Sequence, residues 1–457
     1  MKRRLYTLLC VAATLCAAPL LAVEPTTASG ESDLLTLHDC MAYALSHATR
    51  MQIRQAERDD ARIARRDAVL AAFAPQINAS TYAYYNFGRS IDPQTNTYFT
   101  QTSFHNNYGL SVGFDLFNGF TAVNNLRISR TGMLIAASAE EQAEADICLA
   151  VMEAYYNVVY YTRLAEIYAE QAATAERSLR KAQRQEELGQ KGHADVIQLE
   201  ADLADRQYEL INMRNLLADQ RMILSDLLFW PTDRELRIDT ELPAGASERI
   251  GSAATASADE AVDYALEHHP GVQMAGWQVD QARRELSTAK WSLLPSVALY
   301  AGWSTSYYTY QGSRTDRFGA QFRNNGGEFV EVALSIPLFG RLQGHSRIAR
   351  KRHALTRATA EYEQKRREVE SEVRRAMQDR DGAAAAWTQA ERKSAVQQEA
   401  YALNLRKLEQ GLISPLEFQT ANSNYLKAQA DAMNSLFQYR IKQAVVRYYN
   451  GENYLEQ

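Results

Sequence analysis

Few side chains in the sequence are of a type and spacing that could perform chemistry. His268 and His269 are adjacent, but Pro270 follows them and no third ligand stands at a helical spacing, so we expect a helix end here and no metal site. The four cysteines, at positions 10, 16, 40 and 148, have no spacing typical of a metal site or a disulfide framework. The motifs GxSxG, HExxH, GxGxxG, CxxC and GxxxxGK are all missing. The sequence therefore predicts neither an enzyme nor a bound metal or cofactor.

Two acids occupy matching places, each shortly after a glycine that interrupts a long helical pattern. Asp195 follows Gly189, and Glu417 follows Gly411. An acid in the first turn of a helix is favoured by the helix dipole in any protein. Any further role of this pair depends on what the helices assemble into.

The N-terminus has the pattern of an export signal. Residues 1–22 carry three basic residues directly after Met1, continue with an apolar run and end in small residues, which is typical of a secretory signal peptide. Leu15 precedes Cys16 where a lipoprotein signal needs a small residue, which disfavours lipidation. Removal of residues 1–22 leaves 47 basic and 55 acidic residues, so the mature net charge of −8 disfavours nucleic-acid binding.

The mature chain is amphipathic and contains two cysteines. Apolar residues make up 46% of the sequence, but the mean hydropathy is −0.40 and no later stretch has 18 uninterrupted apolar residues, so we expect no transmembrane helix. Cys40 and Cys148 fall in separate helical patterns, and we expect both to be small buried residues.

The most informative feature is an internal repeat with an offset of 220 to 222 residues. The matching pairs are Tyr43–His47 with Tyr264–His268, Pro75 with Pro295, Leu116–Phe117 with Leu338–Phe339, and Gly189 and Asp195 with Gly411 and Glu417. We expect a signal peptide (1–22), a first repeat (33–230), a connection (231–258), a second repeat (259–449) and a C-terminal tail (450–457).

Long helices are expected in each repeat. Residues 94–230 and 338–414 contain no proline, and both stretches are rich in good helix formers. Each helical pattern breaks at a glycine and restarts, which predicts hairpins with long helices at 119–188 and 341–410 and return helices at 194–229 and 415–449.

Between the first helix and the long helix of each repeat, the apolar pattern has a period of two. This pattern predicts strand pairs within 76–117 and 296–336, with the polar segments 88–106 and 308–326 as exposed loops. About ten residues per strand and many tyrosines fit a transmembrane barrel. Four strands alone would leave unpaired edges in lipid, so other copies must close the barrel, and three copies give twelve strands around an aqueous path.

The ordered set of helix, strand pair, long helix, glycine turn and return helix, found twice over about 33–449, resembles the TolC-type outer-membrane efflux proteins. The resemblance implies a mainly α-helical chain with a transmembrane β part. Three chains would form a 12-stranded outer-membrane barrel, continued by a helical tunnel into the periplasm. It also implies a channel that exports small molecules or polypeptides received from a periplasmic adaptor and an inner-membrane transporter.

The resemblance further implies roles for the hairpin tips. The residues implied in adaptor docking are Leu188, Gly189, Gln190, Gln410, Gly411 and Leu412, although Gln410 stands where the family pattern has an apolar residue. The implied periplasmic aperture comprises Asp195, Glu417 and Thr420, with Thr420 where many relatives carry a second acid. Two alternatives remain open: a passive porin, disfavoured by the high helix content, and a structural envelope tether, disfavoured by the strand pairs.

Overall fold

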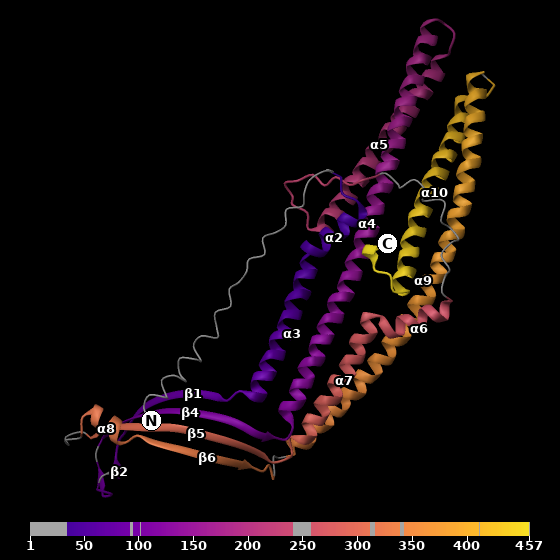
Figure 1. Cartoon of the computed structure of the whole chain (residues 1–457). Coiled ribbons are helices and arrows are strands. Elements are labelled where there is room, and N and C mark those ends of the chain that lie inside the picture. Colours follow the sequence, from indigo (N-terminus) through magenta and orange to yellow (C-terminus); the bar gives the residue numbers. More distant parts are fainter. Residues whose placement is uncertain are drawn as a thin grey trace.

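Two helical hairpins extend from a four-stranded sheet (Figure 1). The computed structural model describes residues 34–91, 95–100, 102–240, 257–310, 316–338, 342–410 and 412–456. The expected signal peptide, Gly411 and much of the connection between the repeats lie outside the described residues.

The helices of the first repeat are α2 (Leu37–His47), α3 (Thr49–Phe73), α4 (Thr121–Glu187) and α5 (His193–Leu228). A capping box of Thr36 and Asp39 starts α2, because each side chain accepts a hydrogen bond from the other residue's backbone N–H. The extended ψ of 130° at Ala48 separates α2 from α3. The first helical segment of the repeat is thus divided into two helices.

The second repeat has the equivalent helices α6 (Ala258–His268), α7 (Pro270–Trp291), α9 (Gln343–Glu409) and α10 (Pro415–Tyr449), and a short 3₁₀ turn, η1 (Tyr454–Glu456), follows α10. His269 lies between α6 and α7, and its Nδ1 accepts a hydrogen bond from the Gly271 N–H at 3.1 Å. His268 and His269 therefore mark a helix junction. No group of three or more His, Cys, Asp or Glu side chains in the described part of the chain is arranged to hold a metal ion.

The duplication extends to unusual backbone conformations. Helices α4 and α9 both have 67 residues, about 100 Å at 1.5 Å per residue. Each starts at a left-handed residue, Phe120 in one repeat and Leu342 in the other, with φ of 59° in both. Such a conformation is costly for a non-glycine residue, so its recurrence 222 positions apart indicates equivalent strand-to-helix turns.

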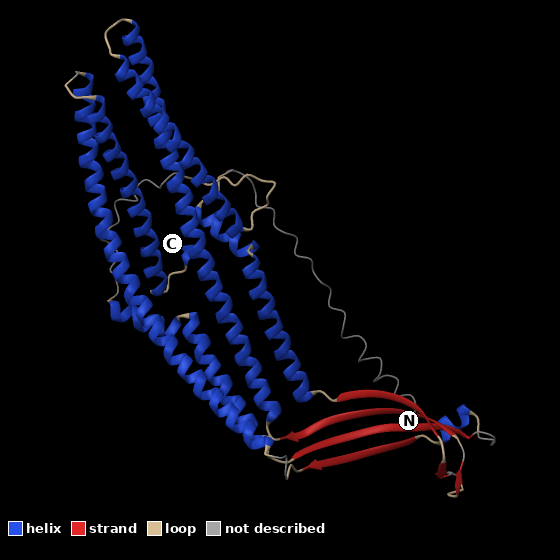
Figure 2. Ribbon diagram, turned by 180° about the vertical axis from the view of Figure 1, so that it is seen from behind, coloured by secondary structure: helices blue, strands red, loops and turns tan. Residues whose placement is uncertain are grey.

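The sheet consists of β1 (Gln76–Asn86), β4 (Ser103–Asn118), β5 (Ser296–Tyr310) and β6 (Gly327–Ser335), in the order β1-β4-β5-β6. All three neighbouring pairs are antiparallel. The fold class expected from the sequence, long helical hairpins with four strands, is confirmed (Figure 2).

The expectation of plain loops at 88–106 and 308–326 is wrong in part. The first segment holds a small hairpin of β2 (Arg89–Ile91) and β3 (Tyr98–Thr100), as well as the start of β4. The second contains helix α8 (Phe318–Asn324). The Gln321 side chain donates to the Tyr308 carbonyl at 2.9 Å and accepts from the Tyr308 N–H at 3.0 Å. These hydrogen bonds form because α8 packs against β5 in the folded chain. The local polar pattern of the sequence therefore does not predict them.

Next to the sheet, the helices form one layer in which α3 packs on α4, α4 on α7 and α7 on α9. Farther from the sheet, the α4–α5 and α9–α10 hairpins continue side by side (Figures 1 and 2). In the described residues, no helix is both long enough and apolar enough to cross a membrane.

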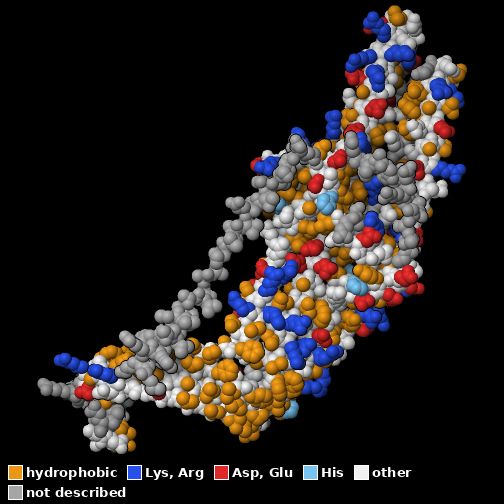
Figure 3. Space-filling view, in the orientation of Figure 1, with side chains coloured by type: hydrophobic (Ala, Val, Ile, Leu, Met, Phe, Trp, Pro, Cys, Tyr) orange, Lys and Arg blue, Asp and Glu red, His pale blue; other side chains and the backbone are white. Residues whose placement is uncertain are grey.

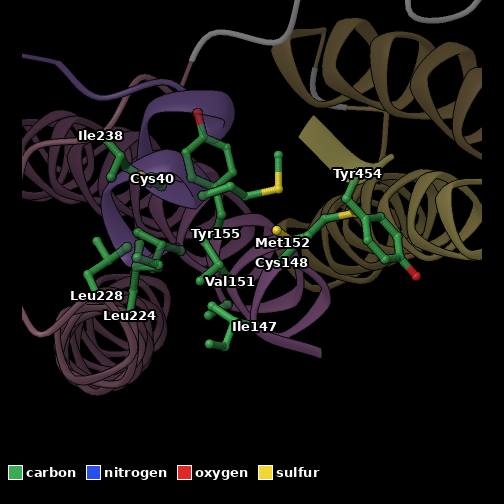
Figure 4. Packing of buried hydrophobic residues seen from close by; sticks show 14 of the residues in the cluster. Cys40, Ile147, Cys148, Val151, Met152, Tyr155, Leu224, Leu228, Ile238 and Tyr454 are labelled. Carbon is green, nitrogen blue, oxygen red and sulfur yellow. The ribbon is translucent and has the colours of Figure 1, made fainter. Parts of the chain in front are cut away.

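The main hydrophobic core joins α2, α4, α5, α10 and the C-terminal η1 turn (Figure 4). Val151, Leu224 and Leu228 are fully buried in it. Cys40 and Cys148 also belong to this core as free thiols, which confirms the expected burial, and burial raises the pKa of each thiol to about 12. The core therefore packs the base of the first hairpin against α10 of the second.

Candidate functional site: the tips of the two hairpins

The first tip is a glycine turn between α4 and α5. Gly189 has a φ of +67°, and its N–H donates to the Glu186 carbonyl at 2.8 Å. The Gln190 N–H donates to the Gln185 carbonyl, also at 2.8 Å, so the turn satisfies the Gln185 and Glu186 carbonyls in the last turn of α4. Leu188 is the C-cap residue of α4, and its side chain is exposed.

The second tip joins α9 to α10. Gln410 caps α9 through its N–H, which donates to the Arg406 carbonyl at 3.1 Å, and Leu412 is exposed. Gly411, expected to complete this turn, lies outside the described residues. Ser414 and Glu417 form a capping box in which each side chain accepts a hydrogen bond from the other's backbone N–H at 3.3 Å. The Glu417 carboxylate thus stabilises the start of α10.

The acids singled out in the sequence occupy equivalent positions. Asp195 is exposed in the first turn of α5, and Glu417 is exposed in the first turn of α10. Thr420, also exposed, follows one turn later on α10. Within the described part of one chain, no hydrogen bond or ion pair joins Asp195 to Glu417. The structure therefore places the acids at both tips and does not bring them together in one copy.

Polar contacts between the two hairpins were not foreseen from the sequence. The Asp202 Oδ1 on α5 accepts a hydrogen bond from the Gln419 Nε2 on α10 at 2.5 Å. Nearby, Gln171 on α4 donates its side-chain amide to the Asn422 Oδ1 at 3.2 Å, and Asn422 donates in return. These pairs tie the first hairpin to the second just behind the tips.

The inter-hairpin contacts line a groove of about 490 Å³. On its wall, the Arg206 Nε lies 3.3 Å from the Asp202 carboxylate, and its side chain is only 11% exposed. Leu408 and Phe418 line the same groove. The sequence does contain a signal for such contacts, because polar side chains on packed helix faces require hydrogen-bond partners. Which residues become the partners depends on how the two hairpins align.

Comparisons with known proteins agree with this architecture. The family model for the outer membrane efflux protein matches twice, over residues 42–228 and 261–451. The outer membrane efflux protein BepC of Brucella suis biovar 1 (strain 1330) is 23% identical over 322 residues, which cover 70% of this chain and 62% of BepC. The alignment thus spans less than two thirds of that relative.

Solved structures of similar fold include CusC and the Campylobacter jejuni CmeC outer membrane channel. CusC has a TM-score of 0.75 at 17% identity, covering 91% of this chain and 92% of CusC. CmeC has a TM-score of 0.74 at 14% identity, covering 95% of this chain and 92% of CmeC. The two matches to the family model together include most of the sequence, and the chain therefore belongs to the outer membrane efflux protein family.

Proposed function

We propose that this protein is the outer-membrane exit duct of a tripartite efflux or secretion system and works as a homotrimer. The observation that carries the proposal is the open four-stranded sheet. Within the described residues, β1 and β6 each pair on one side only. An unpaired edge in lipid costs several kcal/mol per orphaned group, so both edges require partners.

The strand directions favour closure by identical copies. Because the four strands alternate in direction, β6 of one copy meets β1 of the next in the antiparallel sense. Three copies supply twelve strands, whereas two copies supply eight, whose interior side chains would fill. Three copies also supply twelve sheet-proximal helices, from α3, α4, α7 and α9, which match the strands in number and continue the wall as a tube.

The tips are the proposed meeting point with the periplasmic partners. Leu188 and Leu412 are exposed at the far ends of helices about 100 Å long, so they can contact an adaptor protein and an inner-membrane transporter. The proposed aperture is a ring of Asp195, Glu417 and Thr420 from three copies. The cargo passes through it as small molecules or polypeptides chosen by the transporter.

Native mass measurement of the detergent-extracted protein, followed by planar-bilayer recording, tests this proposal. A trimer that forms ion-conducting channels is expected. A stable monomer would refute the closed barrel, and a trimer without conductance would favour a structural tether. Channels unaffected by any substitution at the tips would favour a passive porin.

A further inference from the structure

A hollow lies where the sheet meets the helical layer. It has a volume of about 860 Å³ and is formed by the end of α7, the segment after β6 and the first turns of α9. The lining residues from the end of α7 and the segment after β6, which we call the apolar wall, include Leu293, Pro337 and Leu338, and those from α9, the basic wall, include Arg347, Arg350 and Lys351. Such a divided lining suits an amphiphile with a negatively charged head.

The charge of the basic wall is largely uncompensated. Residues 343–360 of α9 contain five Arg or Lys residues and no acid. The Lys351 Nζ lies 2.6 Å from a Glu285 carboxylate oxygen. Arg347 donates to the Ser292 hydroxyl and Arg350 to the Ser346 carbonyl at 3.4 Å, and neither forms an ion pair with a described carboxylate. Two guanidinium groups therefore remain available for an anion.

The apolar wall continues a wider apolar surface. Leu338 is 90% exposed. Other large apolar side chains exposed at the junction of strands and helices are Leu116, Phe120, Trp291, Leu294, Ile336 and Leu342. Figure 3 shows hydrophobic side chains gathered at this junction and basic side chains over the adjoining helices. Apolar side chains thus lie next to the strands, and basic side chains lie farther along the helices. This order matches the boundary between the acyl chains and the headgroups of a membrane.

In the proposed trimer, the end of α3 from the next copy would bring no free carboxylate to the basic wall. When β6 pairs with β1 of the next copy, the end of that copy's α3 stands beside the hollow, because α3 ends at Phe73 and β1 begins at Gln76. In this part of α3, Arg62 is paired with Asp59 at 2.8 Å and Arg66 with Asp67 at 3.5 Å, while Arg65 donates to the Leu126 carbonyl. The single acid of residues 62–73, Asp67, is thus already paired with Arg66, so this segment offers no free carboxylate to the basic wall.

We propose that this hollow binds an anionic glycerophospholipid of the periplasmic leaflet. Its phosphate would sit between Arg347 and Arg350, and an acyl chain would lie along Leu293 and Leu338. Guanidinium groups are well suited to phosphate because they offer paired donors. The inference depends on the outer-membrane barrel, and it is independent of the gate and of any adaptor.

The test measures lipid retention by the detergent-extracted protein in native mass spectrometry. The probes are phosphatidylglycerol and phosphatidylcholine with identical palmitoyl-oleoyl chains. The variant Arg347→Gln/Arg350→Gln removes two charges from the hollow, and Arg352→Gln/Arg357→Gln removes two from the same helix outside its lining. The first variant should bind phosphatidylglycerol about tenfold more weakly, and the control should stay within about twofold of wild type.

Two further arms identify the ligand. Leu338→Ser should also weaken retention of phosphatidylglycerol, and millimolar inorganic phosphate should not displace the lipid. Equal binding of both lipids, equal losses in both arginine variants, or displacement by phosphate alone would overturn the proposal. If the variant Arg347→Gln/Arg350→Gln fails to assemble, two measurements still test the proposal. They are the preference of the wild-type protein for phosphatidylglycerol over phosphatidylcholine and the lipid retention of Leu338→Ser. A wild-type protein that is monomeric by mass would instead refute the proposed duct. Failure of the lipid proposal can therefore be distinguished from failure of the proposed function.

Discussion

The Asp202 carboxylate on α5 accepts a hydrogen bond from the Gln419 side-chain amide on α10 at 2.5 Å, across 217 positions of sequence. The same carboxylate pairs with Arg206 one turn along α5. Together with the Gln171–Asn422 amide pair, this contact joins the two hairpins of one chain behind their tips. We expect opening of the proposed aperture to move the hairpins apart, and these bonds would oppose that movement.

Asp202→Ala should therefore raise the resting conductance in planar bilayers. The substitution removes a hydrogen bond to a charged group, worth about 1.5–3 kcal/mol, and leaves the largely buried Arg206 without its partner. The matched control is Asp205→Ala, an exposed acid on the same helix. Equal conductance of the two variants would show that the inter-hairpin bond does not restrain the aperture.

The paired substitution Asp195→Asn/Glu417→Gln should weaken cation selectivity and divalent-cation block while trimer yield is unchanged. Three copies of each acid would create a negative potential at the aperture, and the amides remove it. Gln at position 417 can still accept the Ser414 N–H, so the cap is retained.

The control for the aperture variant is Glu200→Gln/Glu399→Gln, which removes the same charge from exposed positions farther along the hairpins. If Asp195 and Glu417 act only on the helix dipole, each substitution should cost about 0.3–1 kcal/mol of local stability. Selectivity and block would then equal those of wild type, and the aperture assignment would be abandoned.

Gly189→Ala should destabilise the first tip by about 1–2 kcal/mol, because an alanine at a φ of +67° is strained. The expected result is faster amide hydrogen exchange around the turn, with no change in the core of α4. Gly192→Ala is the matched control, since Gly192 has an ordinary φ of −77°. Similar exchange in both variants would indicate that the turn does not depend on the left-handed conformation.

The junction of α6 and α7 should lose stability in acid because of His269. Burial, with a smaller effect of Lys365, lowers the pKa of this imidazole from 6.5 to about 4, while Asp146 and Glu368 act in the opposite direction. Since the unfolded state binds the proton more readily, stability is full above about pH 6.5 and is lost as pH falls toward 4, by on the order of 3 kcal/mol.

His269→Asn checks this pH dependence, because asparagine keeps a side-chain acceptor for the Gly271 N–H but does not titrate. The variant's apparent Tm should fall less than that of wild type between pH 7.5 and pH 5. The exposed His268→Asn provides the control, and its pH profile should follow wild type. Identical profiles for all three proteins would refute the assignment to His269.

Local features of the fold were predictable because short-range chemistry sets them. Gly189 ends a helical pattern because glycine tolerates positive φ, and the alternation from residue 107 follows the register of β4 as far as the irregularity between Asp115 and Phe117. The break at Ala48 was not foreseen, because no proline or glycine marks it, although the equivalent junction in the second repeat has Pro270. Helix α8 was also not predicted, because its Gln321 side chain forms its hydrogen bond with the backbone of β5, a distant contact that the local sequence does not reveal.

By itself the sequence determined the duplicated order of elements, the hairpin turns and the positions of Asp195 and Glu417 at the starts of the return helices. Each of these follows from residues close together in the chain, through periodicity and helix-terminus chemistry. Only the tertiary structure decided that Asp202 meets Gln419 and that Arg347 and Arg350 share a hollow with Leu293 and Leu338. These contacts depend on how different helices are aligned and rotated relative to one another. Long-range packing sets that arrangement, and no local sequence pattern encodes it.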